Sequence, residues 1–131
     1  VGPTKIDDVV VVFKAFPTRV GEGPFPTELT HEQSLAMGIQ EFGTVTHRER
    51  RIGTWDGKMA RYSAMINGCT AIAITGVDHI DKDVFGVKAY SNLTPKVREF
   101  LEQIESDTGC PVGIISTGPE QSQIIDIRSE L

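Results

Sequence analysis

The sequence predicts an α/β domain in which helices flank a largely parallel sheet. Short apolar runs rich in β-branched residues alternate with segments whose apolar residues recur at helical spacing. The runs are continuous rather than alternating in polarity, which is typical of strands buried on both faces. A length of 131 residues, of which 39% are hydrophobic, suits one hydrophobic core, so we expect residues 1–131 to form a single unit.

Five segments are expected to form strands. The first, residues 9–16, is a β-branched run that ends in aromatic residues, and we expect it to lie in the middle of the sheet. The others are residues 70–75, 85–90 and 112–115, followed by a short strand at residues 123–127. Residues 17–26 hold three Pro and two Gly and are expected to form a loop.

Three helices are expected. The first covers residues 30–38, with a threonine cap and with Leu35 and Met37 available for apolar contacts. The second covers residues 56–67, is capped by an aspartate, and has one face formed by Met59, Tyr62 and Ile66.

The third helix has the clearest signals. Thr94 is placed to cap it, and Pro95 suits its first turn. Apolar residues at helical spacing then continue until Gly109, namely Val97, Phe100, Leu101 and Ile104.

The chain has a net charge of -5, yet three arginines fall within residues 48–51. The acidic balance argues against binding to nucleic acid or anionic membrane, because such binding depends on many cationic contacts. Guanidinium groups pair with carboxylate and phosphate oxygens two at a time. The cluster therefore indicates a site for a small anion, with a solvated charged loop as the alternative.

Cysteine usage and hydropathy limit the compartment and the cofactors. Cys69 and Cys110 have no CxxC partner and no histidine at metal-ligand spacing, which predicts reduced, partly buried thiols and no metal site. No apolar run approaches the roughly 20 residues that span a bilayer, so we expect a soluble, cytoplasmic protein. The chain begins at Val1 and enters a strand almost at once, and we expect it to be part of a longer protein.

Three loops follow predicted strands, where α/β sheets bind their ligands. They are residues 19–27, 75–78 and 116–119. Asp78 is able to accept from two N–H donors of a guanine edge, with a turn or helix-capping carboxylate as the alternative. The hydroxyls and open backbone of Ser116-Thr117-Gly118 suit a base or a phosphate oxygen, or an ordinary turn.

Several motifs, taken in order, resemble the adenylosuccinate synthetase family. The longest is Thr18-Arg19-Val20-Gly21-Glu22-Gly23-Pro24-Phe25-Pro26-Thr27-Glu28. The others are Lys14-Ala15-Phe16, Glu41-Phe42-Gly43 with the arginine cluster, Asn67-Gly68, Ala73-Ile74-Thr75 with Asp78, and Gly113-Ile114-Ile115-Ser116-Thr117-Gly118-Pro119. The similarity spans essentially the whole chain, and the short spacing between Asp78 and Phe85 resembles the shorter archaeal form.

The resemblance implies the C-terminal portion of a P-loop NTPase-like layered sheet with flanking helices. It implies a ligase of AMP biosynthesis that forms a C–N bond, joining IMP and L-aspartate with GTP hydrolysis to give adenylosuccinate, GDP and phosphate. In the family, GTP phosphorylates the 6-oxygen of IMP, and the aspartate amine then displaces the phosphate. The family works as a homodimer.

The family's phosphate loop, magnesium-binding Asp, and catalytic Asp and His match nothing in this chain. The resemblance thus places Mg²⁺ and the catalytic residues in an absent N-terminal half, and it implies that this chain alone is incomplete. That half, on another chain or in a longer parent protein, is the implied partner.

Within this chain the resemblance assigns two binding sites. Val20 borders the IMP ribose, Thr46 and Arg48 bind the aspartate carboxylates, and Arg50 reaches both aspartate and the GTP phosphates. The set for aspartate and IMP is Val20, Gly43, Thr44, Val45, Thr46, His47, Arg48, Glu49 and Arg50. The set for GTP is Arg50, Gly76, Val77, Asp78, Ser116, Thr117, Gly118 and Pro119.

Three residues depart from the family pattern. Gly76 stands where a lysine is usual, so the aliphatic stem over the base is lost. Val45 replaces a threonine and His47 a glycine in the aspartate loop. These departures keep a second hypothesis open, a non-catalytic purine-nucleotide-binding module or inactive fragment.

Overall fold

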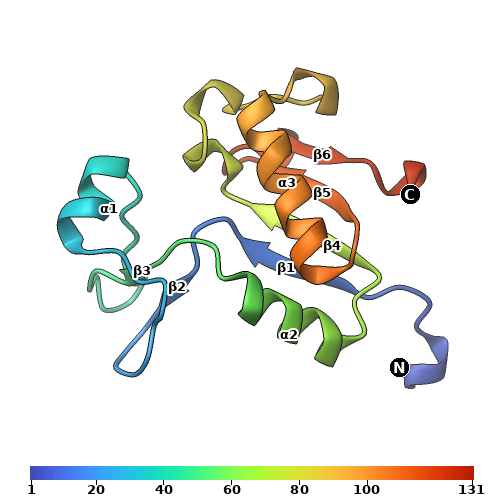
Figure 1. The fold of residues 1–131 in the computed structure, drawn as a ribbon, viewed down its shortest axis with the longest axis horizontal. Coiled ribbons are helices and arrows are strands. Elements are labelled where there is room, and N and C mark those ends of the chain that lie inside the picture. The colour runs from blue at the N-terminus through green and yellow to red at the C-terminus, as the bar shows by residue number, and fades with distance from the viewer.

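Four strands form one sheet in the order β1-β4-β5-β6 in the computed structural model, which describes all 131 residues (Figure 1). Strands β1 (Val10–Lys14), β4 (Ala71–Thr75) and β5 (Val112–Ser116) are parallel, and β6 (Ile124–Asp126) runs antiparallel to β5. The carboxyl ends of the three parallel strands therefore meet at one edge of the sheet. The α/β prediction and four of the five predicted strands are confirmed.

Two helices pack side by side on one face of this sheet, α2 (Gly57–Asn67) and α3 (Pro95–Thr108). The core between them and the sheet is aliphatic, because the β-branched strands meet the apolar face of α3. Its members are Ile72, Ile74, Val77, Val84, Leu93, Val97, Leu101, Ile104, Val112, Ile115 and Ile125. The predicted inward face of the third helix is confirmed.

The position predicted for the first strand was wrong for this chain. β1 pairs only with β4 and lies at the edge of the sheet, with its other edge unpaired. Phe13 packs against the core and forms an edge-to-face contact with Trp55, but Val12 on the opposite face is 65% exposed. An apolar run of this kind is typical of a strand that is buried on both faces. In this chain only the face of β1 that carries Phe13 is covered.

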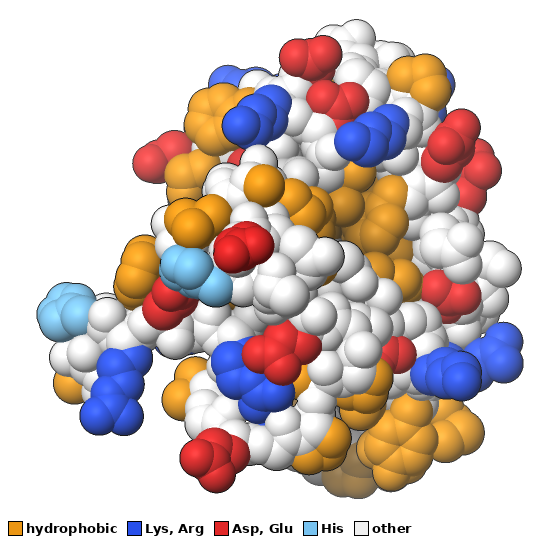
Figure 2. Space-filling model, turned by 60° about the vertical axis from the view of Figure 1, so that its left-hand side comes forward, with side chains coloured by type: hydrophobic (Ala, Val, Ile, Leu, Met, Phe, Trp, Pro, Cys, Tyr) orange, Lys and Arg blue, Asp and Glu red, His pale blue; other side chains and the backbone are white.

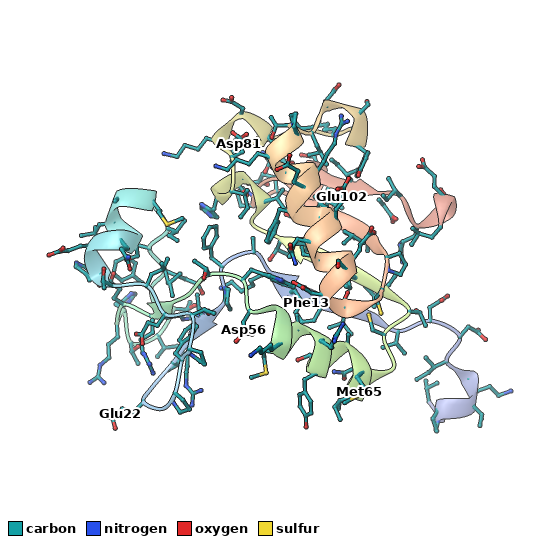
Figure 3. All side chains as sticks on the ribbon, viewed as in Figure 1. Phe13, Glu22, Asp56, Met65, Asp81 and Glu102 are labelled. Carbon is teal, nitrogen blue, oxygen red and sulfur yellow. The ribbon has the colours of Figure 1, made fainter.

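The apolar face predicted for α2 points outward. Ala60 and Ala64 are the buried residues of the helix, whereas Met59, Tyr62 and Ile66 are each about 60% exposed. The small alanine side chains allow α2 to lie close to α3, which turns the larger side chains away from the core. Figure 3 shows Met65 on this outward side as well.

No strand forms at residues 85–90, contrary to the prediction. A 3-10 turn at Lys82–Val84 precedes this segment, and another at Tyr90–Asn92 ends it. Gly86 adopts a φ of 73°, which interrupts any extended run, and its N–H donates to the carbonyl of Thr117 at 3.1 Å. Sequence composition suggested a strand, but the local backbone is a series of turns that packs beside β5.

Residues 17–54 form a side lobe that projects from the carboxyl end of β1 (Figure 1). It contains a two-stranded antiparallel ribbon, β2 (Thr18–Arg19) with β3 (Arg51–Ile52), and the short helix α1 (His31–Met37). The predicted capping by Thr30 is confirmed, since its hydroxyl accepts from the N–H of Gln33 at 3.1 Å. The expected apolar contacts are largely absent because Leu35 and Met37 are 48% and 39% exposed.

The remaining local predictions have mixed outcomes. Thr94 stands at the N-terminus of α3 but does not cap it, because its hydroxyl donates to Asp81 at 2.8 Å. Cys69 and Cys110 are free, half-buried thiols as predicted, and burial raises the pKa of Cys110. None of the helices combines the length and the apolar composition that crossing a bilayer requires.

Candidate functional site

The predicted guanine loop begins where β4 ends. Gly76 adopts a left-handed φ of 76° and starts a 3-10 turn at Val77–His79. Val77 is fully buried in the core, so it anchors the turn and leaves Asp78 partly exposed. Asp78 lies within the turn, as in the turn alternative, but its carboxylate makes no hydrogen bond and no ion pair in the protein. An ionised carboxylate without a protein partner is available to a ligand with two donors.

The loop after β5 lies beside this turn, because β4 and β5 are hydrogen-bonded neighbours. Thr117 is fully buried, and its hydroxyl donates to the carbonyl of Val87 at 2.8 Å, so its side chain holds the loop in place. The Ser116 hydroxyl is also engaged, donating to the Gly118 carbonyl at 2.9 Å. A side chain at Gly118 would displace the amide of Gln123, whose oxygen accepts from the N–H of Glu120 at 2.9 Å. The structure brings the two halves of the predicted guanine site together.

The glycine-rich loop next to Val20 is held by two arginines, Arg51 of β3 and Arg19 of β2. Arg19 donates to the carbonyls of Pro24 at 3.0 Å and Glu22 at 3.2 Å. The Arg51 guanidinium binds Glu28 through two nitrogens, at 2.8 and 2.7 Å, and donates to the carbonyls of Gly21 and Gly23. Val20 is left 78% exposed. Figure 3 shows Glu22 at the tip of this loop, away from the sheet.

The ion pair between Glu28 and Arg51 makes the stability of the loop pH-dependent. The hydrogen bonds from Arg51 hold the pKa of Glu28 below its usual value of 4.5. A carboxyl with a lowered pKa stabilises the fold above its unfolded pKa, and that contribution is lost as the pH falls through the folded value. We expect the unfolding free energy of the chain to fall less steeply below about pH 4.5 in Glu28→Gln than in the wild type.

Denaturant unfolding at several pH values measures this difference. Glu102→Gln is the matched control, because that exposed carboxylate of α3 makes no ion pair in the structure. Equal acid slopes for Glu28→Gln and wild type would show that the pair does not contribute.

Of the three arginines of residues 48–51, Arg48 and Arg50 lie on a hairpin and Arg51 follows it in β3, and each has different partners. We call residues 41–50 the arginine hairpin, in which Phe42 and Glu49 form a bridge and residues 43–48 form the turn. Arg51 binds Glu28 and the glycine-rich loop, and Arg50 donates through Nη1 to Glu41. The Arg48 side chain is exposed and has no partner in the protein. It is the guanidinium most available to an anion.

The turn of the hairpin is largely exposed. Gly43 is half-buried, and a side chain there would meet the Thr46 hydroxyl, so this position requires a small residue. His47 has a φ of 53°, a left-handed conformation that suits the glycine of the family pattern better than histidine. Val45 is 89% exposed, and Thr44 is exposed beside it. Figure 2 shows basic and acidic side chains interspersed on this face rather than one basic patch.

Two residues of the site had no predicted role, Lys14 and Glu41. They form an ion pair, and both line a cavity of about 250 Å³ that also reaches Gly76 and His79. The cavity joins the base of the arginine hairpin to the turn after β4. Both residues lie in the quoted motifs, but only the tertiary structure shows that they meet.

The largest hollow, about 940 Å³, lies elsewhere, between α2, α3 and residues 26–27. It contains none of the predicted site residues. Its central carboxylate, Asp107, already accepts from Trp55 at 2.8 Å and from Gln103 at 2.9 Å. We place the site at the sheet edge rather than here, because the predicted residues Gly76, Asp78 and Ser116 lie at the ends of β4 and β5.

The conformation of Gly76 determines what a lysine would do at this position. An L-residue at a φ of 76° is strained, so we expect Gly76→Lys to lower the unfolding free energy by about 1–2 kcal/mol. Denaturant unfolding measures it, with Gly2→Lys as control, because Gly2 has an extended φ of -74° and no neighbours within 4 Å. An unchanged stability for Gly76→Lys would show that the turn relaxes to accept a side chain.

Comparison with known proteins identifies the family of this chain. The family model of adenylosuccinate synthetase matches residues 1–83. The chain belongs to the adenylosuccinate synthetase family. Curated adenylosuccinate synthetases are similar to it, including those of the archaea Archaeoglobus fulgidus (62% identical over 130 residues) and Methanocaldococcus jannaschii (56% over 131 residues).

The adenylosuccinate synthetases that match are much longer than this chain. The alignments cover 99% and 100% of the chain but 39% and 38% of the two archaeal proteins. The chain thus spans less than half the length of the curated relatives it matches.

Solved structures support the fold. The fully ligated adenylosuccinate synthetase of Plasmodium falciparum superposes with a TM-score of 0.85 and 24% identity, over 96% of this chain and 41% of that one. The succinoaminodeoxyadenylate synthetase of cyanophage S-2L gives 0.68 and 22%, over 92% and 33%. The prediction that the chain has part of the adenylosuccinate synthetase fold is confirmed.

Proposed function

We propose that this chain is part of a ligase of AMP biosynthesis that joins IMP and L-aspartate with GTP hydrolysis, and that it supplies the guanine-binding and aspartate-binding sites. Family membership supports the reaction class. The observation that carries the division of roles is the pair of uncommitted charges, the carboxylate of Asp78 and the guanidinium of Arg48. One suits a base with two donors, and the other suits a carboxylate.

The proposed chemistry assigns the chain a binding and electrostatic role. GTP would phosphorylate the 6-oxygen of IMP, and the amine of aspartate would then displace the phosphate. Arg48 would hold the aspartate carboxylate, and Arg50 would stabilise negative charge that develops during phosphoryl transfer. Val20 would border the ribose of IMP.

Magnesium would be held outside this chain. The chain contains no group of three or more His, Cys, Asp or Glu side chains placed to bind a metal ion. In this proposal the ligands of Mg²⁺ belong to the remaining portion of the enzyme.

That remaining portion is also the proposed partner. The unpaired edge of β1, the exposed Val12 and the outward face of α2 are apolar or unsatisfied surfaces of the kind that another sheet segment covers. An N-terminal portion of the same enzyme would complete the sheet beside β1. A homodimer and a cytoplasmic location stay predictions.

The choice of nucleotide requires its own test. The structure of the cyanophage protein holds dGMP, and dATP as an energy donor, so ATP is a useful comparison for GTP here. Here Asp78 favours guanine, because a carboxylate accepts from the two N–H donors of the guanine edge. An ionised carboxylate has no donor for an acceptor nitrogen of adenine. GTP and ATP should be compared as donors.

Formation of adenylosuccinate from IMP, GTP and aspartate with magnesium tests the proposal. The chain is assayed alone and then with a separately produced N-terminal portion. Turnover only on mixing would support a split ligase. Turnover by the chain alone would contradict the claim that essential groups lie elsewhere. A confirmed complex without turnover would favour the non-catalytic nucleotide-binding module, in keeping with Gly76, Val45 and His47.

A further inference from the structure

Glu41 stands between two cations at the base of the arginine hairpin. One carboxylate oxygen accepts from the ammonium of Lys14 at the end of β1, and the other accepts from NH1 of Arg50 at 2.5 Å. The Lys14 ammonium also donates to the hydroxyl of Thr18 at 3.0 Å. The three charged side chains are all partly shielded, with exposed fractions of 43% for Lys14, 33% for Glu41 and 30% for Arg50.

The backbone reinforces this contact. The N–H of Arg50 donates to the carbonyl of Glu41 at 2.8 Å, so the two residues are paired across the hairpin by main chain as well as by side chain. Glu41 therefore fixes both the position of the Arg50 backbone and the direction of its guanidinium. A planar guanidinium held at one corner has little remaining rotational freedom.

The contact with Glu41 leaves part of the Arg50 guanidinium without a hydrogen-bond partner. Glu41 takes only NH1, while Nε of Arg50 is buried and has no hydrogen-bond partner in the protein. Nη2 of Arg50 also has no partner and, unlike Nε, is not enclosed by the protein, so it is the nitrogen that an anion can reach. The unpaired side of Arg50 is thus oriented by Glu41 but not occupied by it.

Charge balance explains the presence of Lys14. A lone carboxylate would neutralise Arg50 and remove its attraction for an anion. Two cations and one anion leave the cluster with one net positive charge, so Glu41 orients Arg50 without cancelling its charge.

We propose that Glu41 is a positioning residue that orients Arg50 toward the anionic ligands, and that Lys14 keeps the Glu41–Arg50 pair cationic. This inference rests on the proposed function, because it assumes that Arg50 contacts aspartate and the nucleotide phosphates. The cluster also connects the end of β1 to the hairpin, so the sheet edge sets the place of the guanidinium.

Kinetics of the chain combined with the N-terminal portion test the inference. We expect Glu41→Ala to raise the KM for aspartate roughly tenfold, because small misplacement of an orienting group is costly, with a smaller change in the KM for IMP. Glu41→Gln keeps an oxygen that accepts from NH1 and should restore most of the loss. Lys14→Met should raise the KM for aspartate by about fivefold, because the remaining pair is neutral.

A double-mutant cycle separates positioning from a general effect on folding. If Glu41 acts through Arg50, adding Glu41→Ala to Arg50→Ala should change the KM by less than about twofold. Asp126→Asn is the matched control, since it breaks another carboxylate–arginine pair far along the chain on β6 and should leave the KM unchanged. Two results would overturn the inference. One is a change in KM from Glu41→Ala that is equally large in the Arg50→Ala background, and the other is no change in KM from Glu41→Ala when Arg50 is present.

A second measurement is independent of turnover. In the same complex, the Nε–H resonance of Arg50 should be resolved in the wild type and in Glu41→Gln and be broadened in Glu41→Ala. A resonance that is unchanged in Glu41→Ala would refute positioning even if the enzyme is active. Failure of the proposed function would give other results. The wild-type complex would show no turnover, or Arg50→Ala would use aspartate as well as the wild type does.

Discussion

Replacing Arg48 by leucine is expected to lower kcat/KM for aspartate by roughly 100-fold in the complete enzyme, the size of effect seen when one preorganised charged donor is removed. Arg48 is exposed, has no partner in the protein, and lies in the turn of the arginine hairpin. Its removal therefore leaves the fold intact and takes away a charge that only a ligand uses. Leucine keeps the bulk of the side-chain stem but cannot donate.

Initial rates over a range of aspartate concentrations measure this effect. Arg128→Leu is the control, because Arg128 pairs with Asp126 outside the site. Arg48→Lys should retain part of the activity, since charge remains while the two-pronged geometry is lost. Unchanged aspartate use by Arg48→Leu would mean that the assignment of the aspartate site is wrong.

Replacing Asp78 by asparagine is expected to lower kcat/KM for GTP by about 100-fold, because a charge-assisted acceptor is exchanged for a neutral amide. The Asn amide presents one donor and one acceptor, so one N–H of guanine would face another donor. The carboxylate makes no contact that holds the turn together, and Val77 anchors the turn instead. Stability should therefore change little.

The nucleotide series distinguishes guanine recognition from a general loss. Rates with GTP and ATP are compared for the wild type, Asp78→Asn and Asp83→Asn. Asp83 is an exposed carboxylate of the next turn and serves as the control. A loss that is equal for GTP and ATP would show that Asp78 does not read the base.

The main elements of the fold could be predicted because their signals are local. Continuous β-branched runs gave β4 and β5, and helical spacing with a terminal glycine gave α3. The place of β1 in the sheet could not be predicted, since an apolar run shows that a strand is suited to burial but not which strands lie beside it. The segment at residues 85–90 was predicted wrongly because aromatic and β-branched composition conceals the left-handed turn at Gly86.

The candidate site divides in the same way. Arg48 could be proposed from sequence because three arginines cluster in an acidic chain, and Asp78 because it follows a predicted strand. The contact between Lys14 and Glu41 spans 27 residues, so no sequence pattern indicates it. The buried hydroxyl of Thr117 could not be anticipated either, because its partner is the carbonyl of Val87 in a segment expected to be a strand.

The hydrogen bonds that Arg51 makes to the glycine-rich loop link the arginine hairpin to that loop. Arg51 follows the arginine hairpin in the chain, and its guanidinium donates to the carbonyls of Gly21 and Gly23, next to Val20. Displacement of the hairpin strand therefore pulls on the loop that carries Val20, and the reverse holds equally. The bond joins two segments that lie thirty residues apart in sequence. If a ligand at the hairpin changes the affinity for a ligand at Val20, the second ligand changes the affinity for the first by the same factor.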